Sequence, residues 1–328
     1  MFAVMSDLHL PNPKAAVIDR TVAALVALEP RFVVVTGDHI NGSIADGPGV
    51  VKRSASWWRA VAAALAPLRA AHIPVLPVAG NHDSYVTGER AGYAATFGDL
   101  AAWAAPLVLT PAPARPALAK PAHEVARAPF SYAIDVDGLH LDLLDIVDDA
   151  VDPDVAAWLA SDLATPVAKA ARVRIAFSHV PWVSVHQAPL RRLQRDLGPL
   201  LDAGGVDLYI AGHEHFVWDE DFALASGRML RELLVGCASG FYNYGPSLAE
   251  RKTARCAPTT YPGKQSALRC AMPHGGGAFV LAPGRKQRLL QHALATFTLV
   301  TVAADGTVTA VPMTLDAAGA PVPFYLDH

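Results

Sequence analysis

Five apolar, strand-like runs in the sequence lead directly into side chains that can bind metal ions or transfer protons. The runs cover residues 2–5, 32–35, 74–79, 173–177 and 208–210, and the groups that follow them are Asp7 and His9, Asp38, Asn81 with His82 and Asp83, His179, and His213 with His215. Taken alone, the turn at residues 80–83 is equally compatible with capping of the next helix. Five such clusters together indicate an active site, because α/β folds collect reactive groups at the carboxyl ends of their strands.

Seven of these groups form a ligand set of mixed oxygen and nitrogen donors: Asp7, His9, Asp38, Asn81, His179, His213 and His215. Imidazole and carboxylate suit Zn, Fe or Mn, and none of the seven is a thiolate. Seven ligands are about enough for two divalent ions that share one carboxylate and leave room for solvent. We therefore expect two divalent metal ions as cofactors. The sequence indicates no Ser or Cys nucleophile.

The order of these motifs resembles that of the calcineurin-like metallophosphoesterase superfamily. That superfamily carries D-x-H, G-D, G-N-H-D/E, a lone His and G-H-x-H along the chain. This sequence has Asp7-Leu8-His9, Gly37-Asp38, Gly80-Asn81-His82-Asp83, Ser178-His179 and Gly212-His213-Glu214-His215. The resemblance covers residues 2 to about 216 and rests on five ordered blocks.

By motif position, the resemblance implies that Asp7, His9 and His215 hold one ion, that Asn81, His179 and His213 hold the other, and that Asp38 bridges the two. It implies hydrolysis of a small-molecule phosphate ester, in which a metal-bridging hydroxide attacks phosphorus in line. His82 then corresponds to a catalytic histidine that is not a ligand but contacts the substrate, as Asn81 also does. His39, beside Asp38, is a further candidate for substrate binding or for an outer hydrogen bond to the site.

One residue departs from a branch of that superfamily. Purple acid phosphatases place a tyrosine three residues after the bridging Asp, where its phenolate binds ferric iron and gives the colour. This chain has Asn41 at that position, so a coloured ferric enzyme is not expected. Gly236 and Gly240, in a strand-turn context, resemble small members of that branch, so the relation to acid phosphatases stays open.

The elements that must position these groups alternate between strands and helices. Helical periodicity predicts amphipathic helices over residues 13–29 and 57–68, a further helix starting at Asp152-Pro153, and another over residues 190–201. Residues 130–136 and 139–146 predict a hairpin around Asp137-Gly138, whereas residues 41–50 and 106–129 are irregular by composition. After residue 216, strands are expected at 231–235, 278–282, 296–302 and 307–311.

Strand, helix and strand in succession imply parallel pairing with right-handed crossovers. Together with the resemblance, this order predicts an α/β fold: a four-layer α/β/β/α sandwich of two mixed sheets flanked by helices. We expect one domain over residues 1–328, in which residues 1–216 carry the metal motifs and residues 217–328 complete the second sheet as a C-terminal extension.

Composition narrows the partners. The chain has 27 Lys and Arg against 30 Asp and Glu, which gives a formal charge of −3. This balance does not indicate a positively charged surface for binding a polyanion, so nucleic acid is disfavoured as a partner. Hydrophobic residues make up 52% of the chain, but no apolar run approaches the ~20 residues of a membrane span. The first ligand at position 7 leaves no room for a signal peptide in the sequence as given, which is expected of a cytoplasmic protein or of a secreted one whose leader has been removed. An oligomeric state is not indicated.

The cysteines bear on the expected location of the protein in the cell. Cys237 lies in an apolar run and is predicted to be a buried free thiol. Cys256 and Cys270 flank a segment rich in Pro, Gly and Thr, and a bridge between them would favour a periplasmic or secreted protein instead.

Three functions compete on the sequence alone. A metal-dependent phosphoesterase leads, because every ligand position of the superfamily is filled. A non-catalytic interaction scaffold of the same fold would be expected to have lost ligands, and a nuclease is disfavoured by the charge balance. Monoester and diester substrates are not separated, because selection would reside in the loops at residues 39–52, 84–128 and 216–276.

Overall fold

The computed structural model describes residues 1–11, 15–43, 50–105, 107, 129–184, 190–215, 217–239, 255–261, 264–271, 278–281 and 295–323. Within them the helices are α1 (Ala15–Leu28), α2 (Val50–Ala70), α3 (Thr87–Phe97), α4 (Leu100–Ala104), α5 (Pro153–Leu163), α6 (Pro166–Ala170) and α7 (Arg191–Ala203). The predicted start of α5 is confirmed: Asp152 accepts a hydrogen bond from the backbone N–H of Asp154 at 2.8 Å, and Pro153 occupies the first turn.

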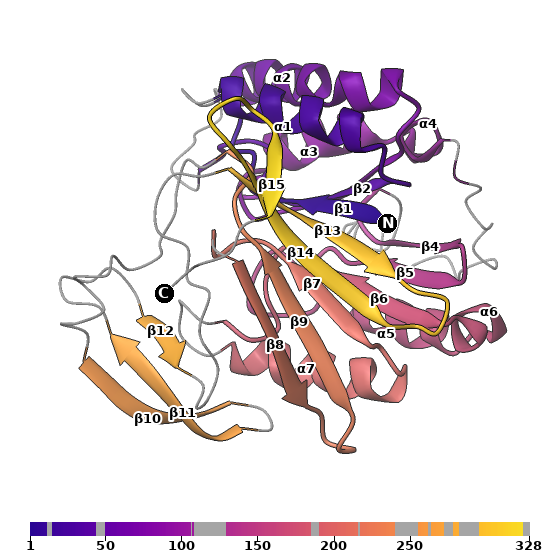
Figure 1. Ribbon diagram of the computed structural model, residues 1–328, viewed down its shortest axis with the longest axis vertical. Helices are drawn as coiled ribbons and strands as arrows, with labels where there is room; N and C mark the ends of the chain where they lie inside the picture. The colour runs from indigo at the N-terminus through magenta and orange to yellow at the C-terminus, as the bar shows by residue number, and fades with distance from the viewer. Residues whose placement is uncertain are drawn as a thin grey trace.

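Two mixed six-stranded sheets form the centre of the molecule (Figure 1). The first has the order β15-β14-β13-β1-β2-β3, built from β1 (Phe2–Met5), β2 (Val33–Thr36), β3 (Val75–Val78), β13 (Thr296–Val302), β14 (Val308–Leu315) and β15 (Pro321–Pro323). The second has the order β4-β5-β6-β7-β9-β8, built from β4 (Tyr132–Val136), β5 (Leu139–Leu143), β6 (Val173–Phe177), β7 (Leu208–Ala211), β8 (Val217–Ala223) and β9 (Met229–Val235). The predicted fold class is confirmed.

Strand alternation explains the four layers. Ala3 and Met5 of β1 pack in the cluster beneath α1, α2 and α3, whereas Phe2 and Val4 of the same strand pack in a second cluster between the two sheets. A third cluster lies under α5 and α7 on the outer face of the second sheet, where Leu159 is fully buried. Strands covered on both faces read as continuous apolar runs, which is the pattern seen in the sequence.

The strands that lead into the candidate ligands are parallel within each sheet. In the first sheet β1 pairs with β2 and β2 with β3, and in the second sheet β5, β6, β7 and β9 pair in succession, all in parallel. Backbone hydrogen bonds link the loops after these strands, from the N–H of Asp7 to the carbonyl of Gly37 and from the N–H of Gly212 to that of His179, each at 3.0 Å. Two contacts cross between the sheets, from the N–H of His213 to Asp7 Oδ2 at 3.1 Å and from Nδ1 of His179 to the Thr36 carbonyl at 2.8 Å, so the carboxyl ends of both parallel sets meet along one edge.

The C-terminal third is divided between the two sheets rather than completing only the second. β8 and β9 extend the second sheet beside β7, but β13 pairs antiparallel with β1 and carries β14 and β15 into the first sheet. The expectation for residues 217–328 is corrected in this respect, because β1 pairs with β2 on one side only and its other edge needs a partner. The single-domain organisation stays a prediction.

A small separate sheet contains β10 (Arg255–Tyr261), β11 (Lys264–Ala271) and β12 (Ala278–Leu281). Cys256 and Cys270 are register partners across β10 and β11, while the state of their side chains lies outside the described residues. Among the described residues Cys237 is a buried thiol that forms no disulfide, as predicted.

Two other predictions meet the limits of the described residues. The irregular segment predicted at residues 106–129 lies outside the described residues, except for residues 107 and 129. The loop predicted at residues 41–50 is described at residues 41–43, and α2 begins at Val50, earlier than the periodicity indicated. No described helix is long and apolar enough to cross a membrane.

Candidate metal centre

The backbone at the strand ends is strained. Five members of the predicted ligand set have a positive φ: Asp7 (59°), His9 (47°), Asp38 (53°), His213 (69°) and His215 (55°). A left-handed conformation in a non-glycine residue costs on the order of 1–3 kcal/mol, and such residues cluster at functional sites because the surrounding structure must hold them there. Each of these turns rotates a side chain from the strand direction towards the edge where the two sheets meet.

Two glycines permit the close approach of the loops. A Cβ atom on Gly80 would lie 2.2 Å from the backbone nitrogen of Asp38, and one on Gly212 would lie 1.8 Å from the Ser6 hydroxyl and 2.8 Å from the Asp7 carboxylate. Both positions therefore require glycine for steric reasons. The glycines of the G-N-H-D and G-H-x-H motifs bring the ligand-bearing loops into contact.

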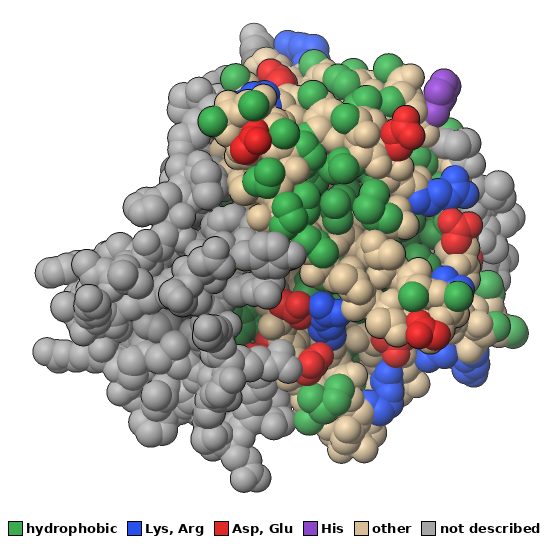
Figure 2. Space-filling view, viewed as in Figure 1, with side chains coloured by type: hydrophobic (Ala, Val, Ile, Leu, Met, Phe, Trp, Pro, Cys, Tyr) green, Lys and Arg blue, Asp and Glu red, His purple; other side chains and the backbone are tan. Residues whose placement is uncertain are grey.

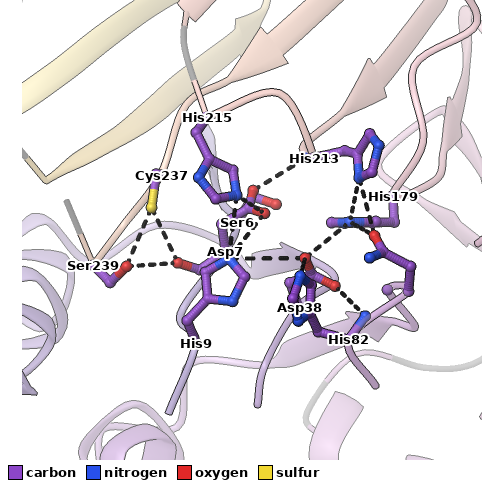
Figure 3. Close-up of polar contacts among 12 residues, drawn as sticks. Ser6, Asp7, His9, Asp38, His82, His179, His213, His215, Cys237 and Ser239 are labelled. Carbon is purple, nitrogen blue, oxygen red and sulfur yellow. Dashed lines mark hydrogen bonds and ion pairs between the residues drawn. The ribbon is translucent and has the colours of Figure 1, made fainter. Parts of the chain in front are cut away.

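One half of the site gathers Asp7, His9 and His215 around a common point (Figure 3). Nε2 of His9 and Nε2 of His215 are 3.1 Å apart, and Asp7 Oδ1 lies 3.0 Å from Nε2 of His215 and 3.6 Å from that of His9. The Asp38 carboxylate completes this group at 3.8 Å from Nε2 of His9. All four side chains are at least 95% buried.

The other half gathers Asn81, His179 and His213 on the opposite side of Asp38. Oδ1 of Asn81 lies 2.9 Å from Nε2 of His179 and 3.0 Å from Nδ1 of His213, and these two ring nitrogens are 3.2 Å apart. Asp38 Oδ2 lies 3.2 Å from Nε2 of His179. The same carboxylate thus reaches both groups, and the structure brings all seven predicted side chains together.

The charges at the site are strongly coupled. Burial alone would raise the pKa of Asp7, but the neighbouring imidazoles, His215 first, lower it well below its ordinary value. Burial alone would lower the pKa of His179, but the Asp38 carboxylate beside it raises that pKa to about 9. Burial, followed by repulsion from His179, lowers the pKa of His213 to about 3. Electrostatic interactions among these carboxylates and imidazoles offset most of the cost of burying their charges in the low-dielectric interior.

The donor set fits metal ions. Oδ1 of Asp7 is buried and makes no hydrogen bond to any described residue, although two imidazole nitrogens lie close to it. Two pairs of ring nitrogens face each other at 3.1–3.2 Å. In each pair a single N–H can occupy only one of the two lone pairs, whereas a metal cation could accept both. The other ring nitrogen of His179, Nδ1, donates a hydrogen bond to the Thr36 carbonyl at 2.8 Å, an orientation typical of metal-binding histidines.

His82 lies beside this set without joining it. Its Nδ1 contacts the Gly42 carbonyl, which fixes a proton on that nitrogen, and its Nε2 lies 3.9 Å from Asp38 Oδ2. The ring packs edge-on against His9, with the centroids 4.8 Å apart, and the side chain is 28% exposed. His82 is therefore oriented towards the site and partly exposed to solvent.

His39 is not brought to the site, which corrects the expectation that it binds substrate. Its ring is fully buried among Trp58, Tyr93 and Phe97, and its Nδ1 lies 2.8 Å from Oδ2 of Asp83. A solute cannot reach a ring in that position. Adjacency to Asp38 was misleading because successive residues at a strand end point in different directions.

Asp83 was part of a motif, but its function was not foreseen. Its carboxylate accepts hydrogen bonds from the backbone of Ile40 at 3.1 Å and of Gly80 at 2.9 Å, in addition to the contact with His39. It therefore fastens the loop after β2 to the loop after β3. The aspartate that ends the G-N-H-D motif was the available sequence signal.

Two further positioning residues come from the C-terminal third. The Ser239 hydroxyl donates to the carbonyl of Asp7 at 2.9 Å, and the Cys237 thiol donates to the same oxygen at 3.3 Å. Both hold the strained turn after β1 in place (Figure 3). No sequence signal linked residues 237–239 to Asp7, because this contact depends on the pairing of distant strands.

The position of Tyr85 bears on the expected absence of colour. Its hydroxyl accepts a hydrogen bond from Nδ2 of Asn81, and burial raises its pKa above the ordinary value. A neutral phenol in this place is a poor source of the phenolate that Asn41 cannot supply.

The chain is similar to known phosphatases in sequence pattern and in fold. The profile of the calcineurin-like phosphoesterase family matches residues 1–217. A purple acid phosphatase from yellow lupin (Lupinus luteus) seeds is similar in structure, with a TM-score of 0.57 and 14% identity over 95% of this chain and 51% of that one. A dimetal phosphatase from Danio rerio gives a TM-score of 0.48 and 14% identity over 86% of this chain and 98% of its own.

At 14% identity the match to the lupin protein supports the fold alone. The chain spans about half the length of the lupin protein. No curated protein sequence matches it.

Proposed function

Because the chain belongs to the calcineurin-like phosphoesterase family, we propose that it hydrolyses a phosphate ester with two divalent metal ions as cofactors. The observation that carries the proposal is the convergence of seven carboxylate, amide and imidazole groups, six of them buried, from five separate loops onto one edge of the two sheets. A protein that used this fold only as a scaffold would have no need to maintain strained, coupled and desolvated groups there.

The ligands divide into two groups with one member in common. Asp7, His9 and His215 would hold one ion, Asn81, His179 and His213 would hold the other, and Asp38 would contact both. The position of Asp38 Oδ2 supports this division, at 3.8 Å from His9 and 3.2 Å from His179. Imidazole and oxygen donors suit Mn, Fe or Zn.

When bound, the two ions would supply an activated water at neutral pH and positive charge beside the phosphoryl oxygens. In the hydrolysis, the water oxygen bonds to phosphorus, the ester P–O bond breaks, and a proton must reach the departing alkoxide. Nε2 of His82 faces the site, and its Nδ1 is held by Gly42, so a protonated His82 ring can donate that proton. Asn81 and His82 flank the place where the phosphoryl group would lie.

The surface favours a small substrate over a polyanion. The net charge is −3, and acidic and basic side chains are interspersed on the face shown in Figure 2. A nucleic acid would be expected to need a continuous basic surface. The proposed substrate is a small phosphate ester, and both monoesters and diesters fit the chemistry described.

A screen of phosphomonoesters and phosphodiesters with Mn²⁺ added tests the proposal. We expect the wild-type protein to hydrolyse at least one class, and the Asp38→Ala variant to hydrolyse neither. A folded, metal-loaded wild-type protein that releases no product from any ester would favour the non-catalytic scaffold.

A further inference from the structure

A second buried cluster of histidine and aspartate lies away from the strand-end loops, between β4, β5 and α5. His140 and Asp142 of β5 alternate with Leu139, Leu141 and Leu143, so they face the helices while the leucines face the other sheet. Asp162 of α5 lies opposite them. His140 is 1% exposed, Asp142 0% and Asp162 6%, at positions where the surrounding layer is otherwise apolar.

The separations within this cluster match those of ligands around one ion. Nε2 of His140 lies 3.4 Å from Asp142 Oδ2 and 3.2 Å from Asp162 Oδ2, and one donor atom from each residue lies within 4.8 Å of the others. Ligands placed ~2.0–2.1 Å from a tetrahedral zinc ion stand ~3.3 Å from one another. The two distances to His140 fall on that value.

Direct hydrogen bonds do not account for the arrangement. Nε2 of His140 and both carboxylate oxygens of Asp142 make no hydrogen bond to any residue that the structure describes. The other ring nitrogen, Nδ1 of His140, lies 2.7 Å from Asp135 Oδ1 on the paired strand β4. A carboxylate that holds the far nitrogen of an imidazole is the usual outer support of a metal-binding histidine.

The cluster also carries excess negative charge. Arg174, the register partner of His140 on β6, directs its guanidinium to the backbone carbonyls of Ala168, Lys169, Gly204 and Gly205 instead. Asp162 lies in the last turn of α5, where the helix dipole disfavours a carboxylate. Buried carboxylates need a compensating cation, and two carboxylates with a neutral imidazole are balanced by one divalent ion.

We propose that His140, Asp142 and Asp162 bind a divalent cation of the zinc class, separate from the centre at the strand ends. This ion would join α5 to the outer face of the second sheet. The proposal does not depend on the phosphoesterase activity, because none of its residues lies in the strand-end loops.

Protons offer the competing way to balance these charges. Burial alone would lower the pKa of His140, but its contacts with Asp142 and Asp162 raise that pKa to about 10. A cluster balanced in this way would hold an imidazolium and would take up no ion.

Zinc content per chain distinguishes the two. We would equilibrate the full-length protein with Zn²⁺, remove unbound ions and count zinc in the wild type, in the double variant Asp142→Asn, Asp162→Asn, and in Asp152→Asn. Asp152 caps α5 outside the cluster, and Asn caps a helix equally well. The double variant should bind about one ion fewer than both other proteins, and equal zinc in all three would overturn the proposal.

Diffraction from wild-type crystals grown with Zn²⁺ gives an answer that does not depend on the variants folding. Anomalous scattering at the zinc edge should show a peak between His140 and Asp142 in addition to those at the strand-end loops. Peaks at the strand-end loops alone would reject the second site while leaving the proposed function intact.

Discussion

Two histidines of the strand-end site differ in their surroundings, and the difference assigns them separate roles. The His179 ring is fully buried and lies within 3.2 Å of Asp38. The His82 ring is partly open to solvent and stands 3.9 Å from the same carboxylate. Under the proposed function, His179 would bind an ion and His82 would contact the substrate.

The role proposed for His82 predicts a dependence on the leaving group. His82→Ala should lose ~10²–10⁴-fold in kcat/KM on alkyl phosphate esters, which need protonation of the departing alkoxide. The loss on nitrophenyl esters should be much smaller, because nitrophenolate leaves without a proton. Metal content should be unchanged.

A matched control for His82→Ala is His72→Ala, which removes an exposed histidine outside the site. It should change neither ester class. Equal losses on both ester classes, accompanied by depleted metal, would show that His82 only braces the loop.

The raised pKa of His179 predicts proton release on metal binding. With a pKa of about 9, this ring is protonated at about pH 7 in the metal-free protein, whereas His213, with a pKa of about 3, is already neutral. A metal ion binds neutral imidazole, so binding must displace the proton from His179, and metal affinity should rise with pH up to about pH 9.

Titration calorimetry in buffers of different ionisation enthalpy counts those protons. At about pH 7 the wild type should release about one proton more per chain than His179→Gln when Mn²⁺ is added. The same proton release in both proteins would show that His179 is neutral before the ion binds.

Side-chain chemistry was predictable from the sequence, but side-chain direction was not. The seven candidate ligands were predictable by type and order, since each follows an apolar run. The direction of His39 could not be read from the sequence, which left substrate binding and an outer hydrogen bond both open, and the ring is turned into the aromatic cluster around Phe97. The sequence does not reveal the cluster around His140, because Asp162 lies on a different element.

At the scale of elements, the site depends on fastening loops from separate strands. Asp83 joins the loops after β2 and β3, and Ser239 joins the turn after β1 to the segment after β9. Parallel strands place the loops at one edge, but these side chains fix their relative positions.

Asp83→Asn tests this fastening. The new amide can accept only with its oxygen, so at least one of the N–H groups now paired with Asp83 loses its acceptor. Leaving a buried donor unpaired costs about 1–3 kcal/mol, and the free energy of unfolding should fall by that amount, with weaker metal binding.

Asp99→Asn serves as the comparison for Asp83→Asn. Asp99 is exposed and caps α4, where Asn is an equally good cap, so stability should not change. A fall in the free energy of unfolding that is the same in both variants would contradict the role of Asp83.

Most of the order of elements up to residue 216 was predictable because short-range patterns specify it, but α3 and α4 lie in the segment 84–128 that was expected to be a loop, and α6 was not predicted. Apolar runs, helical periodicity and the Asp137-Gly138 turn all match strands and helices of the structure. The destination of later strands was not predictable, since β13 pairs with β1 across nearly the whole chain and no local pattern records such a partner. Boundaries shifted for the same reason, as at the start of α2.

At the scale of the molecule, both sheets contribute residues to the strand-end site. The first sheet supplies Asp7, His9, Asp38 and Asn81, and the second supplies His179, His213 and His215. Neither half of the ligand set comes from one sheet alone, because Asn81 faces His179 and His213 while His215 faces Asp7 and His9. Packing of the sheets through their shared apolar cluster is therefore a condition for the site.

Hydrolysis by metal-stripped protein tests the central claim most directly. We would remove ions from the wild type with a chelator, then measure release of product from the best ester of the screen while Mn²⁺ is returned. The account predicts no activity in the stripped protein, recovery as ions are restored, and no recovery in Asp38→Ala, whose carboxylate would contact both ions. Full activity in the stripped wild-type protein would contradict it.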